Sequence, residues 1–204
     1  MENNLEKPTW CYKPIENVPN LDKIQKEFYR IFTHFYKNTF DDVGHDIIQI
    51  DINMVNKLTP NFINFIKKLD LYDILTNVAF SGSVGKQKEI CPIHIDTKEW
   101  QNVSYALNLP IIGCENSYTV FYKVIESAGS EKTTKVTNRY EGSVAYPDNS
   151  SEEIDRMPAG QPAFVNVSVP HRPVTNHTDL RIVVTARFSS KIFDYVDNEI
   201  FKTK

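Results

Sequence analysis

Apolar residues recur at steps of three and four positions in two segments of the first third of the chain. From Leu21 to Tyr36 this period predicts an amphipathic helix, with Asn20 available as its N-cap. Thr59-Pro60 predicts the start of a second helix, because proline is favoured at the first helical position. The apolar stripe of this second helix consists of Phe62, Phe65, Ile66 and Leu69. Both stripes are expected to face the protein core.

Beyond Asp70 the pattern changes to short runs of β-branched and aromatic residues separated by Gly, Pro, Asn and Ser, which is typical of strands joined by turns. Strands are expected at Ile74–Phe80, Val103–Leu109, Tyr118–Val124, Ser143–Tyr146, Ala163–Val169 and Leu180–Phe188, with an earlier one at Ile47–Ile52. Helices followed by many short strands predict an α+β fold, in which helices support one face of a β-sandwich or barrel.

One long segment stands outside this pattern. From Glu126 to Met157 the chain is polar and has only a weak strand signal at its middle, so we expect a long loop. Such a loop is either a functional lid or a flexible excursion. We expect a single domain over residues 1–204, with mainly helical support from residues 1–73 and a β core over residues 74–190.

The composition is that of a folded globular protein. A hydrophobic fraction of 41% and an aromatic fraction of 12% argue against disorder. The formal charge of -3 gives no bulk electrostatic reason to expect nucleic acid or a membrane as partner. With no apolar run of membrane-spanning length and no secretory signal, a cytoplasmic location is expected. Cys11, Cys91 and Cys114 have no CxxC spacing and are expected to be reduced, buried thiols.

The first chemical motif is His94-x-Asp96. In an extended segment, residues two apart point to the same side, so the imidazole and the carboxylate can converge on one ion. Alone the motif is weak, because the same pair also occurs in solvated turns and hydrogen-bonded cores. Cys91 lies three residues before His94, and its proximity alone does not make it a ligand.

A third ligand is expected from His171, which follows the strand-like run Ala163–Val169. Two histidines and one carboxylate on one face of a metal leave positions open for substrate and O₂, the arrangement of non-haem iron(II) oxygenases. Zinc could occupy the same ligands, so the metal stays open at this stage. His177 competes for the role of the distal ligand.

Arg181 adds a cation ten residues after His171. In a strand it shares one face with Val183, Thr185 and Arg187. A guanidinium on such a face is costly to bury unless it meets an anion. We therefore expect Arg181 to bind an anion in the site, and Arg187 to pair with a structural Asp or Glu.

The order His94-x-Asp96, His171 and Arg181 resembles the iron(II)- and 2-oxoglutarate-dependent oxygenase superfamily. The stretch that runs from Tyr105-Ala-Leu-Asn108-Leu-Pro110 to Thr119-Val-Phe121-Tyr122 is similar to small hydroxylase-like members from phages and bacteria. The resemblance covers roughly residues 74–188. It implies a double-stranded β-helix, or jelly roll, buttressed by the N-terminal helices. It also implies iron(II) bound by His94, Asp96 and His171, and 2-oxoglutarate held by Arg181.

The resemblance further implies a dioxygenase that uses O₂ to hydroxylate a C–H bond of an amino acid, peptidyl residue or other polar small molecule, with release of succinate and CO₂. Many relatives carry Arg-x-Ser at the cosubstrate site, whereas here Val183 stands two positions beyond Arg181. A hydroxyl group would therefore come from another residue. The candidates are Tyr105, Thr119, Tyr122 and Thr185.

Two other functions remain open. The spacing of Arg181 and Arg187 is reminiscent of the nucleic-acid dealkylating branch of the same superfamily, although the chain lacks the Asn-x-Tyr segment of that branch. A non-catalytic jelly-roll binding module is the alternative from a different class, because jelly rolls carry many functions. The sequence leaves the substrate and the oligomeric state undetermined.

Overall fold

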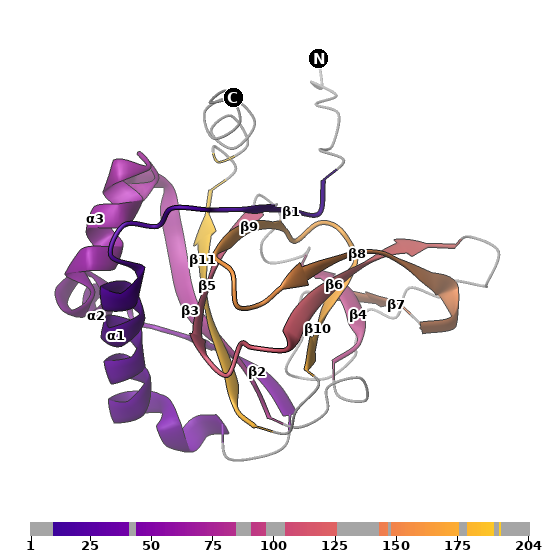
Figure 1. The fold of residues 1–204 in the computed structure, drawn as a ribbon, viewed down its shortest axis with the longest axis horizontal. Coiled ribbons are helices and arrows are strands. Elements are labelled where there is room, and N and C mark those ends of the chain that lie inside the picture. The colour runs from indigo at the N-terminus through magenta and orange to yellow at the C-terminus, as the bar shows by residue number, and fades with distance from the viewer. Residues whose placement is uncertain are drawn as a thin grey trace.

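A computed structural model describes residues 10–40, 44–84, 91–96, 105–125, 143–146, 148–175, 179–189 and 192. At 44–46 and 143–145 it describes the backbone alone. Two antiparallel sheets face each other, and the helices cover the outer surface of one of them (Figure 1). The fold class is thus the predicted one, with helices on one side of a β-sandwich.

The N-terminal helices form largely where the apolar period predicts them. Helix α1 spans Leu21–Ile31 and continues as a π-helical turn, Phe32–Tyr36, and a 3₁₀ turn, Lys37–Phe40. Helix α3 spans Pro60–Lys68 and has its proline in the first turn. Asn20 and Thr59 occupy the N-cap positions of these helices, but neither makes a side-chain capping bond.

The strand expected at Ile47–Ile52 ends earlier than predicted. Strand β2 spans Gly44–Gln49, and a short helix, α2, follows at Ile52–Leu58. The reason is local: Asp51 caps α2 by accepting a hydrogen bond from the amide of Asn53, at 2.7 Å.

The first sheet has six strands in the order β1-β9-β5-β11-β3-β2. Besides β2, its strands are β1 Tyr12–Pro14, β3 Leu75–Val84, β5 Tyr105–Ile112, β9 Ala163–Asn166 and β11 Arg181–Phe188. The second sheet has five strands in the order β7-β4-β10-β6-β8. They are β4 Ile93–Asp96, β6 Ser117–Val124, β7 Ser143–Tyr146, β8 Ser151–Pro158 and β10 His171–Thr175.

Successive strands cross between the two sheets. From β3 to β6, and again from β8 to β11, each strand lies in the sheet opposite the one before it. Such a path winds two sheets into a double-stranded β-helix, the jelly roll that the resemblance implies. Strands β1 and β2 also belong to the first sheet, so residues 1–73 contribute strands as well as helices.

The loop expected to run as far as Met157 is shorter than predicted. Residues 126–142 lie outside the described part of the chain, but Ser151–Pro158 is strand β8. This strand lies at a sheet edge, and most of its side chains are exposed. Its polar composition therefore resembles that of a loop, which explains the wrong prediction.

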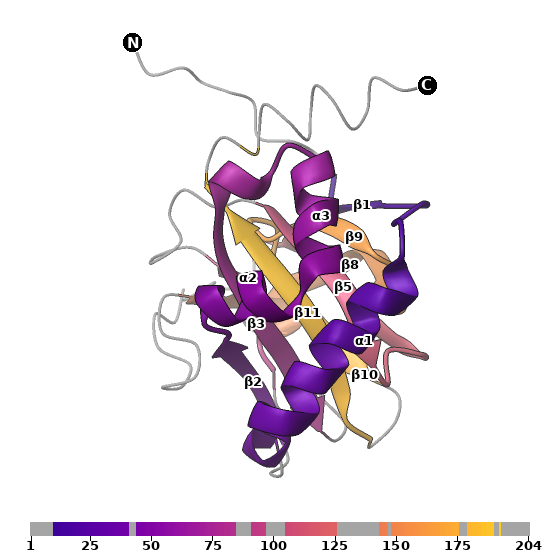
Figure 2. The same cartoon turned by 90° about the vertical axis from the view of Figure 1, so that its left-hand side faces the viewer.

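The main apolar core lies between the first sheet and the helices (Figure 2). Phe28 of α1 packs edge-on against Phe62 of α3, with ring centroids 5.0 Å apart, and against Phe80 of β3 at 6.3 Å. Alternate residues of β11 point into this core: Ile182, Val184, Ala186 and Phe188. The other face of β11 lines the space between the sheets, where the functional side chains lie.

Candidate metal centre

The structure brings His94, Asp96 and His171 together between the sheets. His94 and His171 are direct partners across the antiparallel strands β4 and β10, and their ring centroids are 4.7 Å apart. Asp96 projects from β4 on the same side as His94, with 3.6 Å between Oδ1 and the His94 Nε2. One ligand atom from each residue lies within 4.8 Å of the others. The strand pairing therefore builds a three-ligand set from distant parts of the chain.

Backbone carbonyls orient both imidazoles. The Nδ1 of His94 lies 2.9 Å from the carbonyl oxygen of Pro92, and the Nδ1 of His171 lies 2.8 Å from that of Val169. A carbonyl only accepts, so each Nδ1 carries a proton and donates it. Each Nε2 then keeps its lone pair for a metal, an arrangement that metal-binding histidines commonly use.

Arg187 of β11 provides the counter-charge of the site. Its Nη2 donates to Oδ2 of Asp96 at 2.7 Å, and both side chains are nearly buried. The structural carboxylate expected for Arg187 is therefore the one predicted to bind metal. Burial alone would raise the pKa of Asp96, but Arg187, with smaller effects from His171 and His94, lowers it to about 2.

The two histidines have opposite pKa shifts. Burial, together with the neighbouring charge of His94, lowers the pKa of His171 to about 4. Burial would also lower the pKa of His94, but Cys91 and Asp96 outweigh it and raise that pKa to about 9. The directions are opposed because two adjacent imidazoles cannot both be protonated at low cost. Besides the two Nδ1 protons, the metal-free site thus holds one additional proton, on His94, which a bound cation would displace.

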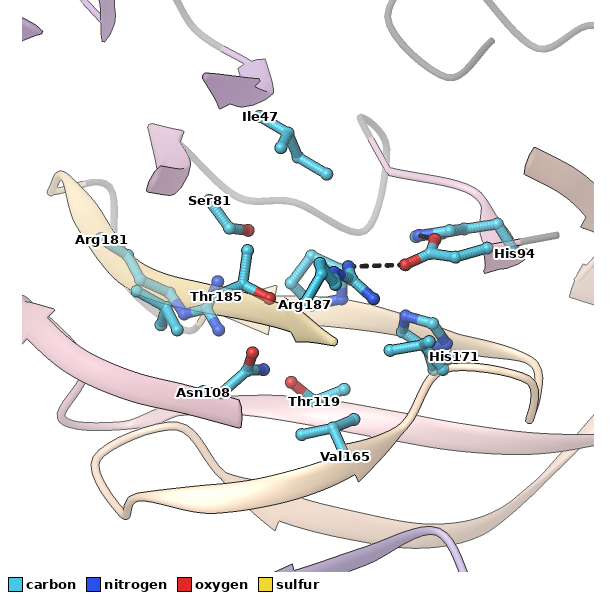
Figure 3. A pocket seen from close by; sticks show the side chains of 14 residues that line it. Ile47, Ser81, His94, Asn108, Thr119, Val165, His171, Arg181, Thr185 and Arg187 are labelled. Carbon is cyan, nitrogen blue, oxygen red and sulfur yellow. Dashed lines mark hydrogen bonds and ion pairs between the residues drawn. The ribbon is translucent and has the colours of Figure 1, made fainter. Parts of the chain in front are cut away.

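A cavity of about 50 Å³ adjoins the three residues. Figure 3 shows His94 and His171 at one end of this cavity and Arg181 at the other, with Thr185 between them. Fourteen side chains line it: Ile47, Ser81, His94, Asp96, Asn108, Thr119, Val165, Val167, His171, Pro173, Arg181, Val183, Thr185 and Arg187. Three of the predicted cosubstrate-binding residues, Arg181, Thr119 and Thr185, are among them.

Arg181 is the most unusual residue of this cavity. It is 2% exposed, and its Nε and Nη1 have no hydrogen-bond partner among the described residues. Burial lowers its pKa, which is the direction expected for a cation without a strong anionic partner. Thr185 Oγ1 and Asn108 Oδ1 are likewise buried without a partner in the described part of the chain. A buried cation with unused donors is costly unless a ligand supplies an anion.

Two predicted cosubstrate-binding residues do not line the cavity. Tyr105 faces the helices and stacks on Trp10, with ring centroids 4.7 Å apart. Tyr122 faces outward from the second sheet, where its hydroxyl accepts a hydrogen bond from Arg172 Nε at 3.0 Å. Thr119 and Tyr122 are three positions apart, and residues at that spacing face opposite ways along a strand.

Asn108 is a cavity residue that was not predicted to bind the cosubstrate. It pairs directly with Thr185 across β5 and β11. A signal for it exists in the sequence, because Asn108 is the single polar residue within the apolar run from Ala106 to Ile112. His177, the competing distal ligand, lies outside the described residues, and His34 is exposed on the π-helical turn.

The described helices include none that is both long enough and apolar enough to cross a bilayer. No protein-family model matches the sequence. A search of curated proteins also finds no match.

A comparison with solved structures does find similar chains. One is SnoK, a non-heme alpha ketoglutarate dependent carbocyclase from nogalamycin biosynthesis, at 10% identity and a TM-score of 0.49, covering 87% of this chain and 79% of SnoK. The epimerase SnoN from the same biosynthesis matches at 11% identity and a TM-score of 0.48, covering 87% of this chain and 78% of SnoN. HygX from Streptomyces hygroscopicus, with nickel and 2-oxoglutarate bound, matches at 9% identity and a TM-score of 0.47, covering 87% of this chain and 82% of HygX. At such low identities and scores, the function of this chain has to be inferred from its own residues.

Proposed function

We propose that this protein is an iron(II)- and 2-oxoglutarate-dependent dioxygenase that hydroxylates a C–H bond of its substrate. The observation that carries the proposal is the presence, in one cavity, of a two-histidine, one-carboxylate set and of a buried arginine without an anionic partner among the described residues. The three ligands alone would also suit a structural ion, and the arginine alone would suit any small anion. Together they fit a metal and a dicarboxylate bound side by side.

The donor set suits iron(II). Two imidazole nitrogens and one carboxylate oxygen on a single face leave open positions, as in non-haem iron(II) oxygenases, whereas structural zinc sites use four protein ligands. Catalytic zinc sites also use three protein ligands, so it is the guanidinium at the other end of the cavity that favours iron(II) with a dicarboxylate. Asp96, held by Arg187 through Oδ2, has its Oδ1 on the side of His94 Nε2. Arg187 thereby orients the carboxylate and leaves one oxygen for the metal.

The other end of the cavity fits a carboxylate. Arg181 offers Nε and Nη1, two donors of one guanidinium that have no protein partner in the described residues, and either of them can donate to an oxygen of a carboxylate. Thr185 and Thr119 line the same cavity, and a hydroxyl of either could add a hydrogen bond. A small dicarboxylic acid such as 2-oxoglutarate is thus suited to a cavity with a metal site at one end and a guanidinium at the other.

In the proposed reaction, O₂, 2-oxoglutarate and the substrate R–H give R–OH, succinate and CO₂. One oxygen atom enters succinate and the other enters the substrate, so 2-oxoglutarate supplies the two further electrons that reduce O₂. Bound iron would supply the activation of O₂. The chain's own residues bind and orient the reactants, and the buried cavity keeps water from the reacting groups.

The test is binding followed by turnover. Anaerobic addition of iron(II) and 2-oxoglutarate should produce a weak visible charge-transfer band, and neither addition alone should do so. Succinate release should then depend on substrate in a panel of amino acids, peptides and nucleosides. The variant His171→Ala serves as the blank, and turnover that survives this substitution would reject the proposal. A binding module that lacks catalysis would show neither the band nor succinate.

A further inference from the structure

The cavity is too small to hold a substrate beside the cosubstrate. Its volume of about 50 Å³ corresponds to a few water molecules, since one water needs roughly 10–15 Å³ by the same measure. This step rests on the proposed function, under which 2-oxoglutarate binds in the cavity and would fill it. The substrate must therefore lie at the rim of the barrel and send only a small group towards the metal.

Strand β2 forms one part of this rim. It is an edge strand, with β3 as its one neighbour among the described strands (Figure 2). Its residue Ile47 is 41% exposed and also lines the cavity. Figure 3 shows the Ile47 side chain apart from the other labelled residues of the cavity. A surface that continues from the strand edge to the metal site therefore passes over Ile47.

The edge of β2 differs from the other described sheet edges. Proteins protect edge strands with charges, proline, bulges or short length, because free backbone groups would otherwise pair with another chain. Strand β1 is three residues long and includes Lys13 and Pro14, and β7 is four residues long. Most of the exposed side chains of strand β8 are charged: Glu152, Glu153, Asp155 and Arg156.

Strand β2 lacks most of these protections. Its six residues, Gly44-His45-Asp46-Ile47-Ile48-Gln49, include one charge, that of Asp46, but no lysine and no proline, and its pairing with β3 runs without a bulge. The less protected edge thus contains Ile47, a residue that lines the cavity of the metal centre. An edge of this kind can bind an extended peptide by adding it as a strand, with main-chain hydrogen bonds for affinity and alternate side chains for specificity.

We propose that the substrate is a peptide segment that pairs in extended form with the outer edge of β2 and directs one side chain past Ile47 towards the metal centre. An added strand would lie roughly 5 Å from β2. Every second side chain of the peptide would then point to the cavity side of the sheet. This deepens the proposed function by naming a peptidyl residue, rather than a free metabolite, as the group that is oxidised.

The first test compares substrates. Blocked nonapeptide libraries with one position fixed at a time would be incubated with the enzyme, iron(II), 2-oxoglutarate and O₂, beside free amino acids and nucleosides. The expected result is a mass gain of one oxygen atom in peptides alone. Turnover of a free amino acid or nucleoside, or of no library member by enzyme that binds iron and 2-oxoglutarate, would overturn the inference. Failure to bind iron and 2-oxoglutarate would instead reject the proposed function.

A second test examines the pairing itself. Methylation of single backbone amides of the best peptide should weaken its binding at alternate positions, because only every second amide of an added strand faces β2. Equal effects at all positions, or none, would contradict edge pairing. Hydrogen exchange at the amides of residues 44–49 should slow when the peptide is added.

A matched pair of variants completes the test. Ile47→Lys places a guard charge on β2, whereas Ile154→Lys places the same charge on β8, where Ile154 is 51% exposed. We expect Ile47→Lys to raise the peptide Kd at least tenfold and Ile154→Lys to leave it within twofold. If Ile47→Lys weakens 2-oxoglutarate binding as strongly as peptide binding, the substitution acts on the cavity and the inference fails.

Discussion

Arg187 on β11 and Asp96 on β4 join the two sheets across the interior of the barrel, through a contact of 2.7 Å between Nη2 and Oδ2. One partner lies in each sheet, and the carboxylate is also a proposed metal ligand. The pair therefore links the stability of the barrel to the geometry of the metal centre. Changes at Arg187 should affect both.

We expect Arg187→Met to weaken iron(II) binding by about 10- to 100-fold, the usual effect of losing a group that orients a metal ligand. The metal-free protein should also lose about 3–5 kcal/mol of stability, because the substitution leaves a buried carboxylate without its partner. Anaerobic calorimetric titration and urea unfolding measure the two effects. Arg156→Met is the control, because its pair with Glu153 is exposed and should contribute less than about 1 kcal/mol. Unchanged metal affinity in Arg187→Met would contradict the positioning role.

The same pair predicts how stability depends on pH in the metal-free protein. The pKa of Asp96 falls from 3.8 to about 2 on folding, so the folded state favours the ionised carboxylate. The stability that the pair contributes is fully present above pH 3.8, the ordinary pKa of the carboxyl, and is lost as the pH falls through about 2. The difference in unfolding free energy between the parent and Arg187→Met should therefore shrink over this range. A difference that grows with acidification would contradict the assignment.

We expect Arg181→Met to weaken 2-oxoglutarate binding by at least about 30-fold, while metal binding is retained. The ligand-free variant should also be more stable than the parent, because the substitution removes a buried charge whose Nε and Nη1 lack partners in the described residues. Arg172→Met is the matched control. Arg172 is similarly buried but faces away from the cavity and pairs with Asp148 and Tyr122. Its loss should leave 2-oxoglutarate affinity unchanged, and equal losses in both variants would move the anion site elsewhere.

A purely structural prediction concerns Glu27 on α1. Its carboxylate accepts hydrogen bonds from the amide of Asn61 at 3.0 Å and the amide of Phe62 at 3.3 Å, which are the first free donors of α3. We expect Glu27→Ala to cost about 1–2 kcal/mol, because it removes a cap and a negative charge from a helix N-terminus. Urea unfolding measures this, with the exposed Glu152→Ala as control. Iron and 2-oxoglutarate affinities should not change, and a loss of either would show that α1 influences the site.

Local rules were sufficient for part of this protein. The apolar period located α1 and α3, and strand alternation placed His94 with Asp96, and Arg181 with Thr185, on shared faces. These relationships hold within single elements, where backbone geometry determines which side chains lie together. They were enough to predict several of the residues that line the cavity of the proposed metal and anion site.

Only the tertiary structure decided which faces meet. Alternation groups the residues of a strand into two sets, but it does not say which set faces the interior. That choice depends on where the helices cover the sheet, and it excluded Tyr105 and Tyr122 from the cavity and included Asn108. The pairing of His94 with His171, and of Arg187 with Asp96, likewise required strands that are distant in sequence to pack together. Non-local contacts of this kind depend on the packing of the whole barrel, so a single segment carries no signal for them.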